Sequence, residues 1–337
     1  MIQEALQKLI GGGSLTQDEA IAANEEIMTG EATPAQIGAL LTALRIKGES
    51  VEEISGMAKV MREKALRVLT DGEVVDVVGT GGDGMGTFNI STASALVTAA
   101  AGVAVAKHGN RAASGTFGAA DILEANGVKL ELKPESVKRC IDEVGIGFMF
   151  APAFHPAMRF AGPVRRELGF RTVFNILGPL TNPAGANYQL LGVAMPELVE
   201  QMANVLASLG TKRSWVVRGD DGLDELTTTS TSQVYEVTGG RVRHFEVSPE
   251  EAGLGRVKLS EIQASGSTSH AAMFVAALSE AESAPKDIVL LNSAAALVVA
   301  GRAADLRAGV TTAREVINNG AALEKLKTLA VLSQTLE

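Results

Sequence analysis

The feature of this sequence that most constrains its fold is a short β-branched run that leads into a glycine-rich loop and then into a helix. The run Val74-Val-Asp-Val-Val78 is typical of a buried strand, and Gly79-Thr-Gly-Gly-Asp-Gly-Met-Gly86 follows it. Apolar residues then predict a helix from about Ser91 to Ala101 and a second strand from Val103 to Ala106. This order is a βαβ unit, in which a helix joins two parallel strands and covers one face of their sheet.

Further apolar runs extend the predicted sheet. We expect strands at Gly145–Phe150, Gln189–Val193, Trp215–Arg218, Gln233–Val237 and Ile288–Leu291. Helices are expected between several of them, and this alternation predicts an α/β fold with a mainly parallel central sheet. A chain of 337 residues, of which 46% are hydrophobic and 20% charged, is long enough for one large core or for two domains.

The first 70 residues predict a helical unit instead of more sheet. Helix-start signals occur at Thr16 with Glu19, at Thr33-Pro34, and at Ser50 with Glu53. Apolar residues follow at helical spacing, namely Ile37, Leu40, Leu41 and Leu44 in one helix and Ile54, Met57, Ala58 and Met61 in the next. These stripes are equally compatible with packing on the rest of the chain and with a dimer interface.

We therefore expect a small helical N-terminal domain over residues 1–70 and a larger α/β domain over 71–337. A helix and a Pro/Gly-rich loop at about 165–186 interrupt the α/β pattern, and we expect them to join the helical domain.

Charge and cysteine content exclude several classes of protein. The formal net charge of −9 argues against a nucleic-acid partner. No apolar run reaches the roughly 20 residues that cross a bilayer, and MIQEALQKLI lacks the basic-then-apolar order of a signal peptide. Cys140 is the only cysteine, which excludes intramolecular disulfides and a cysteine-rich zinc site. Together these features predict a cytoplasmic protein without a membrane partner.

The glycine-rich loop suits a phosphate ligand. Its five glycines allow a polyanion to approach the backbone amides, and hydroxyl and amide side chains follow where the next helix begins. The alternative is a structural turn with a helix cap. Gly79, Gly81 and Gly84 also match a dinucleotide fingerprint, but the second strand leads to Lys107 instead of an acidic residue that could hold a ribose.

Lys107 and an acidic loop add the charges that a diphosphate site requires. An ammonium group at the end of an apolar strand is costly unless it has a partner, and an anionic ligand would provide one; the alternative is a solvated lysine. Asp224 and Glu225 lie in a loop after a predicted strand, where adjacent carboxylates repel unless a cation holds them. Magnesium bridging a diphosphate is one explanation, and a solvated acidic turn is the other.

Two further segments are less decisive on their residues alone. Ser114-Gly-Thr-Phe-Gly118 forms a second small-residue loop before a helix from Ala119 to Asn126, in which Asp121 and Glu124 need no functional role. The stretch from His155 to Pro183 is rich in arginine and apolar residues. Its composition is compatible with a pocket that clamps a carboxylate and with an ordinary helix surface.

Taken together, these segments resemble the anthranilate phosphoribosyltransferase family in order and over almost the whole chain. The matching motifs are GTGGD (Gly79–Asp83), FNIST (Phe88–Thr92), KHGNRA (Lys107–Ala112), HPAM (His155–Met158), VRRELGFRTVFNILGPLTNP (Val164–Pro183) and DGLDEL (Asp221–Leu226). The resemblance implies a nucleoside phosphorylase/phosphoribosyltransferase-like fold and an active site at a hinge. It also implies a homodimer through the helical domain, and transfer of a phosphoribosyl group from phosphoribosyl pyrophosphate to anthranilate in tryptophan biosynthesis.

The same resemblance assigns site residues by position. The donor site would comprise Gly79, Gly82, Asp83, Thr87, Asn89, Ile90, Ser91, Thr92, Lys107, His108, Gly109, Ser114 and Gly115. Anthranilate would lie against Gly79, Asn110, Arg165, His108 and His155. Magnesium (Mg2+) would be held by Ser91, Asp224 and Glu225, and the residues of greatest catalytic weight would be Lys107, Asn110 and Arg165.

One stretch departs from the family pattern. After KHGNRA the family usually has a serine-rich segment resembling SSKSGSAD, whereas this chain has Ser114-Gly-Thr-Phe-Gly-Ala-Ala-Asp121. Phe117 and Ala119 cannot donate hydrogen bonds from their side chains, so we expect an active enzyme with weakened donor affinity. Alternatively, Phe117 packs into the core. A nucleoside phosphorylase and a catalytically silent homologue are the rival functions.

Overall fold

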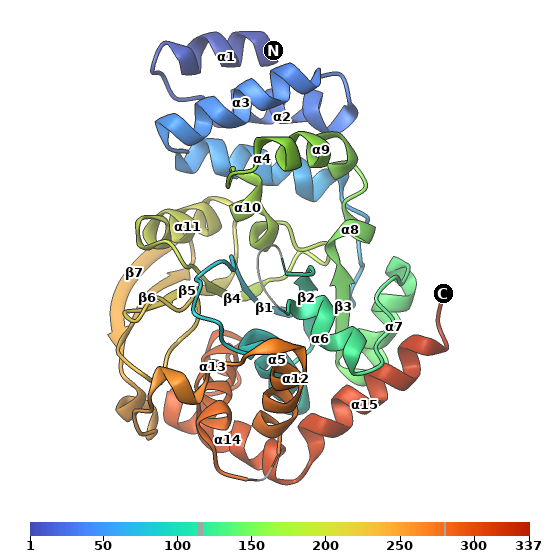
Figure 1. The fold of residues 1–337 in the computed structure, drawn as a ribbon, viewed down its shortest axis with the longest axis vertical. Coiled ribbons are helices and arrows are strands. Elements are labelled where there is room, and N and C mark those ends of the chain that lie inside the picture. The colour runs from blue at the N-terminus through green and yellow to red at the C-terminus, as the bar shows by residue number, and fades with distance from the viewer. Residues whose placement is uncertain (113–116, 280) are drawn as a thin grey trace.

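A computed structural model describes residues 1–112, 117–279 and 281–337. Its N-terminal unit consists of helices α1 (Ile2–Ile10), α2 (Gln17–Thr29), α3 (Pro34–Lys47) and α4 (Val51–Lys64), which lie together at one end of the molecule (Figure 1). The predicted capping box is confirmed: the Thr16 hydroxyl accepts from the Glu19 amide, and the Glu19 side chain accepts from the Thr16 amide. Equivalent boxes begin α3 at Thr33 and α4 at Ser50.

The chain returns to this unit after the third strand, through α8 (Ala151–Phe154), α9 (Met158–Leu168) and α10 (Phe174–Leu177). Helix α9 packs so closely on α2 that a Cβ built on Gly30 would lie 2.5 Å from the Phe160 ring. Backbone hydrogen bonds from Leu66 to Phe154 and from Val68 to Pro183 join the segments that connect the two units. Figure 1 shows α10 between the N-terminal helices and the sheet.

The apolar stripes of the N-terminal helices are buried within the single chain, because all eight residues predicted for α3 and α4 are at most 6% exposed. Packing on the rest of the chain therefore accounts for these stripes. Of the two interpretations of the stripes, the structure supports this one, and any dimer contact must use other residues.

The predicted mainly parallel sheet is confirmed. Seven strands lie in the order β3-β2-β1-β4-β5-β6-β7, and the last two pairings are antiparallel. The strands are β1 (Val75–Gly79), β2 (Val105–Gly109), β3 (Ile146–Phe150), β4 (Tyr188–Gly192), β5 (Arg213–Gly219), β6 (Ser232–Thr238) and β7 (Arg241–Val247). The strand order reverses between β1 and β4, because the chain continues from β1 toward β2 and β3 at one edge of the sheet and from β4 toward β5, β6 and β7 at the other.

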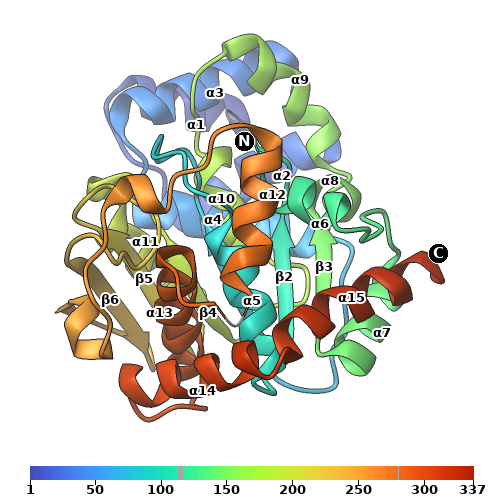
Figure 2. The same ribbon diagram turned by 60° about the horizontal axis from the view of Figure 1, so that its bottom comes forward.

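Helices cover both faces of the sheet. They are α5 (Ile90–Ala100), α6 (Ala119–Ala125), α7 (Pro134–Val144), α11 (Pro196–Ser208), α12 (Gly266–Ala277), α13 (Ala284–Val299), α14 (Leu306–Asn318) and α15 (Ala321–Gln334). Short 3₁₀ helices occupy Gly178–Leu180, Pro249–Ala252 and Leu259–Glu261. Figure 2 shows α5, α12 and α13 in front of one face. None of the helices that the structure describes is long and apolar enough to cross a membrane.

Successive strand residues divide between two cores, as the alternation of side chains along a strand requires. Leu190 and Val217 belong to the core that contains α5 and α13. Their neighbours Leu191 and Val216 belong to the core that contains α11 and the N-terminal helices. The helical unit is thus anchored to one face of the sheet by a continuous apolar core.

The sequence-based assignment of one element is wrong, and one strand was not predicted. Ile288–Leu291 is not a strand but part of α13, whose middle is buried on every side and so has no helical period in its hydropathy. The Ser283 hydroxyl caps this helix at the Lys286 amide, which is the signal that could have identified it. Strand β7 was not expected, because it lies at the sheet edge and alternates charged with apolar residues.

The acidic loop after β5 lies directly on the ends of two central strands. Gly79 and Gly192 are neighbours in the β1–β4 register. A Cβ on Gly79 would lie 2.5 Å from Asp224 Oδ2, and one on Gly192 would overlap the Asp224 carbonyl oxygen. Neither position can carry a side chain without moving Asp224.

We therefore expect Gly192→Ala to destabilise the protein by about 1–3 kcal/mol, which is typical of overpacking in a tightly packed site. Thermal or urea unfolding measures this, and Gly255→Ala is the control, because a Cβ there has no atom within 4 Å. Equal stability of the two variants would contradict the packing described for Asp224.

Candidate active site

The glycine-rich loop, the acidic loop and the residues at the end of β2 lie at the carboxyl ends of the parallel strands, beside the point where the strand order reverses. Open α/β sheets bind ligands at such a point, because loops from adjacent strands separate there. The glycine-rich loop leaves β1, the acidic loop leaves β5, and Lys107 and His108 lie near the end of β2.

The glycine-rich loop is held open in a conformation that other residues rarely adopt. Gly81, Gly82, Gly84 and Gly86 have φ angles between 65° and 76°. The Gly81 amide donates to Asp224 Oδ2 at 2.7 Å, and the Gly86 carbonyl accepts from the Ala264 amide at 2.8 Å. Both ends of the loop are therefore fixed to other segments.

The start of α5 presents polar groups beside this loop. Asn89 caps the helix, since its Oδ1 accepts from the Thr92 amide at 3.1 Å. The Thr92 hydroxyl is buried and has no hydrogen-bond partner among the described residues. Thr87 pairs with Gln263 in an isolated bridge. The Ile90 side chain is 2% exposed in the core, so only the backbone of this predicted donor residue can face a ligand.

Lys107 lies within β2, not after the strand as the sequence suggested, because β2 extends to Gly109. Its side chain is 1% exposed, and Nζ donates to the Val77 carbonyl at 2.6 Å and to Ser91 Oγ at 3.3 Å. Burial lowers the pKa of Lys107, while the nearby Asp76 and Glu225 carboxylates oppose that shift. The ammonium group is thus surrounded by oxygen atoms at the base of the glycine-rich loop.

Asp76 is a functional candidate that the sequence analysis did not single out. It is fully buried, and its carboxylate accepts from the His108 amide at 3.2 Å and from Asn182 Nδ2 at 2.8 Å. Asn182 Nδ2 also donates to the Ala106 carbonyl. Burial raises the pKa of Asp76 to about 6, although Lys107 opposes the shift. An aspartate in the middle of an apolar strand was the signal available in the sequence.

The acidic loop brings carboxylates together where they repel one another. Burial, followed by the charge of Asp83, raises the pKa of Asp224 to about 7. Burial, followed by the charge of Asp224, raises the pKa of Glu225 well above its ordinary value. The loop is held from below by Asn292 on α13, which accepts from the Leu226 amide at 3.0 Å and donates to its carbonyl at 2.8 Å.

This donor set suits a magnesium ion only in part. Carboxylate and hydroxyl oxygens are the hard ligands that Mg2+ prefers, and a cation here would offset both the burial of Asp224 and Glu225 and their mutual repulsion. Within the described ranges, however, no three His, Cys, Asp or Glu side chains are placed to hold a metal. Ser91, Asp224 and Glu225 would therefore supply some of the ligands, and a bound phosphate or water would supply the others.

On the other side of β2, two buried histidines face each other. His108 Nε2 and His155 Nε2 are 3.2 Å apart, and His108 Nδ1 lies 3.2 Å from the Gly178 carbonyl. Burial lowers the pKa of His108 to about 3 and that of His155 to about 4, so both rings are neutral at pH 7. Since His108 Nδ1 must donate to the carbonyl, its Nε2 accepts from His155 Nε2.

Arg165 on α9 is half-buried, and its guanidinium lies 5.6 Å from the centroid of the Phe174 ring. Burial lowers its pKa, and no carboxylate in the described part of the chain forms an ion pair with it. Asn110 is exposed and its Oδ1 accepts from the Arg111 amide at 2.7 Å. No hydrogen bond between the described residues joins Asn110 to Arg165.

The segment that departs from the family pattern is only partly described. Ser114 and Gly115, which were predicted to bind the donor, lie outside the described residues. Phe117 packs against the main core and stacks on His270 of α12, with ring centroids 5.8 Å apart. The packing alternative for Phe117 is thus the one that the structure supports. Gly109 is also required for packing, since a Cβ there would lie 2.9 Å from Phe148.

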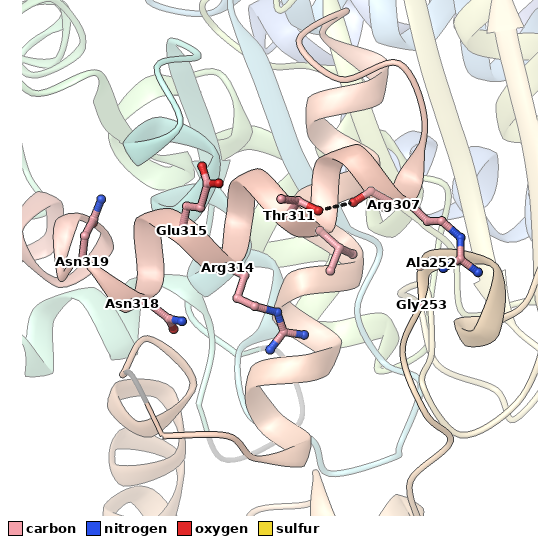
Figure 3. A pocket seen from close by; sticks show the side chains of 9 residues that line it. Ala252, Gly253, Arg307, Thr311, Arg314, Glu315, Asn318 and Asn319 are labelled. Atoms are coloured by element: carbon pink, nitrogen blue, oxygen red, sulfur yellow. Dashed lines mark hydrogen bonds between the residues drawn. The ribbon is translucent and has the colours of Figure 1, made fainter.

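A pocket of about 940 Å³ lies along α14, away from the residues described above (Figure 3). Its lining residues are Ala252, Gly253, Arg307, Val310, Thr311, Arg314, Glu315, Asn318 and Asn319. None of these is among the predicted site residues, and Arg307 and Arg314 already bond to Glu250 and Glu282. The pocket is therefore separate from the candidate active site.

Known proteins resemble this chain over its full length. Residues 71–323 match the glycosyl transferase family, a/b domain, and residues 3–65 match the glycosyl transferase family, helical bundle domain. Anthranilate phosphoribosyltransferase of Chloroflexus aggregans is 54% identical over 335 residues, which are 99% of this chain and 98% of that protein. The Dehalococcoides mccartyi protein of the same name is 51% identical over 338 residues, covering 100% and 99% of the two chains.

Solved structures agree with these sequence relatives. Anthranilate phosphoribosyltransferase from Thermus thermophilus superimposes with a TM-score of 0.92 at 45% identity, covering 98% of this chain and 99% of the other. The Saccharomyces cerevisiae enzyme in complex with PRPP and Mg superimposes with a TM-score of 0.91 at 27% identity, covering 99% and 98%.

The buried histidine pair predicts a dependence of stability on pH. Because folding lowers the pKa of His155 from 6.5 to about 4, the unfolded chain binds the proton more readily. The stability that His155 contributes is therefore complete above about pH 6.5 and is lost as the pH falls toward 4. His155→Gln should reduce the loss of unfolding free energy between pH 7 and 5 by about 2 kcal/mol.

Urea unfolding at pH 7, 6 and 5 measures the difference between parent and variant. The raised pKa values of Asp76 and Asp224 act in the opposite direction, but they are present in both proteins and cancel. Parallel pH curves for the two proteins would show that His155 is not buried in its neutral form.

Proposed function

Because this chain belongs to the anthranilate phosphoribosyltransferase family, we propose that the ends of β1, β2 and β5, with the segment 155–182, form the site of its reaction. The reaction transfers the phosphoribosyl group from 5-phosphoribosyl 1-diphosphate to anthranilate, and it releases diphosphate in a step of tryptophan biosynthesis. The observation that carries the assignment of the site is the position of Lys107, whose buried ammonium contacts the Val77 carbonyl before the glycine-rich loop and the Ser91 hydroxyl after it, with Glu225 of the acidic loop nearby.

The donor lies along the glycine-rich loop and the start of α5. The residues assigned to it are Gly79, Gly82, Asp83, Thr87, Asn89, Ile90, Ser91, Thr92, Lys107, His108 and Gly109, together with Ser114 and Gly115. The open loop offers backbone amides to the phosphates, and the unpaired Thr92 hydroxyl offers a further donor among the described residues. Neutral donors and a positive charge thus line the loop, as an anionic ligand on an acidic protein requires.

Lys107 and the amides of the glycine-rich loop stabilise negative charge on the diphosphate leaving group, and no side chain is needed to deprotonate the amine before it attacks. The amine nitrogen of anthranilate is already a nucleophile, and its bond to the anomeric carbon forms as the bond from that carbon to diphosphate breaks. Negative charge develops on the diphosphate oxygens, and the proton that the substituted nitrogen loses afterwards passes to water. Lys107 and the loop amides are fixed before the reaction, so they stabilise this charge without reorganising. A magnesium ion held by Ser91, Asp224 and Glu225 would add positive charge at the same diphosphate oxygens.

The acceptor lies between the histidine pair and α9. Arg165 has no carboxylate partner among the described residues, so it can bind the carboxylate of anthranilate, and the buried Phe174 ring beneath it supports the guanidinium. Gly79, Asn110, His108 and His155 border the same region. Since both histidines are neutral, neither competes with Arg165 for the carboxylate or protonates the amine.

We also infer a homodimer through the N-terminal helices, in the cytoplasm. Ile10 on α1 is 78% exposed and Ile46 on α3 is 81% exposed, so these apolar side chains are available for a contact between two copies of the chain. Charge and the lone buried Cys140 are consistent with a reducing compartment. The mass in solution, measured by light scattering, tests the dimer.

Fluorescence of anthranilate provides the direct test of the reaction. The purified protein should consume anthranilate only when 5-phosphoribosyl 1-diphosphate and Mg2+ are both present. Consumption with inorganic phosphate and a nucleoside in place of the donor would instead indicate a nucleoside phosphorylase, and no consumption in any mixture would indicate a silent homologue.

Removing the charges of the acidic pair should separate metal use from folding. Asp224→Asn with Glu225→Gln should reduce kcat/KM for the donor about a hundredfold, because metal ligands have effects of that order. The thermal midpoint without ligand should not fall, since burial already disfavours both charges. Asp220→Asn, an exposed position in the same loop, is the control. Parent turnover of the double variant at low Mg2+ would refute the assignment.

Arg165→Ala should raise the KM for anthranilate about ten- to a hundredfold, as the loss of a charged hydrogen bond does, and should change the donor KM much less. Arg166→Ala removes the same charge from an exposed neighbour and should change neither constant. Equal effects of Arg165→Ala on both substrates would indicate a structural role.

A further inference from the structure

Arg171 lies between α9 and α10, and its guanidinium reaches across to the glycine-rich loop. Nη2 and Nη1 lie 3.3 and 3.4 Å from the Gly81 carbonyl oxygen, to which both donate. A Cβ built on Gly82 would overlap Nη1 of the same side chain. The absence of a side chain at position 82 therefore gives the guanidinium its place against the loop.

Gly81 is consequently held at both of its backbone groups. Its amide donates to Asp224 Oδ2 at 2.7 Å, and its carbonyl accepts from Arg171. The first partner belongs to the acidic loop of the α/β unit, and the second to the segment that returns from the N-terminal helices. Gly81, which has a positive φ, is thus held through its backbone by the Asp224 carboxylate and the Arg171 guanidinium.

The backbone that carries Arg171 is well anchored. Gly169 ends α9 in a left-handed conformation, and the chain turns into the core at Thr172, which is 4% exposed and whose amide donates to Asn175 Oδ1 at 2.9 Å. Phe174, three residues beyond Arg171, lies beneath Arg165. The same short segment therefore supports a contact to the donor loop and the proposed contact to anthranilate.

No ion pair neutralises Arg171 within the described part of the chain, in contrast to Arg111, which binds Asp121 and Glu124. The two hydrogen bonds of its guanidinium both go to the Gly81 carbonyl. Arg171 is thus committed to the loop and not to a carboxylate on its own segment.

We propose that Arg171 is a positioning residue that ties the glycine-rich loop to the acceptor segment. It acts through Gly81 and sets the separation between the loop amides that receive the diphosphate and the Arg165 guanidinium that receives anthranilate. This inference rests on the proposed function for its catalytic consequence, whereas the tie itself is a property of the ligand-free protein.

Arg171→Ala and Arg171→Lys test the tie, with Arg166→Ala as the matched control. Arg166 carries the same charge on the same segment but is exposed, and no hydrogen bond among the described residues joins it to the loop. Hydrogen exchange of residues 79–86 in the ligand-free protein should be faster in Arg171→Ala than in the parent or in Arg166→Ala. Its thermal midpoint should stay within about 2 °C, because the contact is at the surface.

Calorimetric titration with 5-phosphoribosyl 1-diphosphate and Mg2+ should show a dissociation constant about tenfold higher for Arg171→Ala. A change of that size is expected when a hydrogen bond from a charged guanidinium is lost. Its kcat should fall and its KM for anthranilate should stay within about twofold, since Arg165 is untouched. Arg171→Lys, which keeps one donor, should recover part of both losses.

Unchanged hydrogen exchange of the loop in Arg171→Ala would show that Arg171 does not fix the glycine-rich loop. Equal donor binding by Arg171→Ala and Arg166→Ala would overturn its role in positioning the donor. If the parent itself fails to bind the donor while hydrogen exchange of residues 79–86 is still faster in Arg171→Ala, the proposed function is wrong and the contact between Arg171 and the loop is confirmed.

Discussion

The arrangement of the site depends on one buried cation. Lys107 lies inside a central strand, and its ammonium contacts the Val77 carbonyl on β1 and the Ser91 hydroxyl on α5, with the charges of Asp76 and Glu225 nearby. A buried charge is stable only when oxygen atoms surround it in fixed positions. This requirement holds β1, β2, the start of α5 and the acidic loop in one geometry, because each of them supplies part of the surroundings.

The other titratable groups at this edge follow from the same burial. Burial raises the pKa of Asp224 and Glu225 and lowers that of His108 and His155, so each group is shifted toward its neutral form. Carboxylates that repel one another favour a cation, and the neutral imidazoles add no positive charge near them. The ligand-free protein thus has a charge pattern that a magnesium diphosphate and an aromatic carboxylate would complement.

Both sides of the site depend on glycines where two segments meet. Gly79 and Gly192 allow Asp224 to lie on the strand ends, and Gly82 allows Arg171 to lie on the glycine-rich loop. The second loop is different, because this chain replaces hydroxyl side chains with Phe117, which stacks on His270. Phe117 is therefore part of the packing against α12.

The sequence by itself determined the βαβ unit, the glycine-rich loop, the capped helices and the mainly parallel sheet, because each depends on local period, capping and turn residues. It could not place Asp76, Asn182 or Arg171, since their partners are 32 to 106 positions away along the chain. It misassigned Ile288–Leu291, because a helix buried on all sides has no hydrophobic period. Only the tertiary structure decided that Lys107 is inside its strand and that Gly81 lies between two ionisable side chains, since burial and long-range contact arise when distant segments pack together.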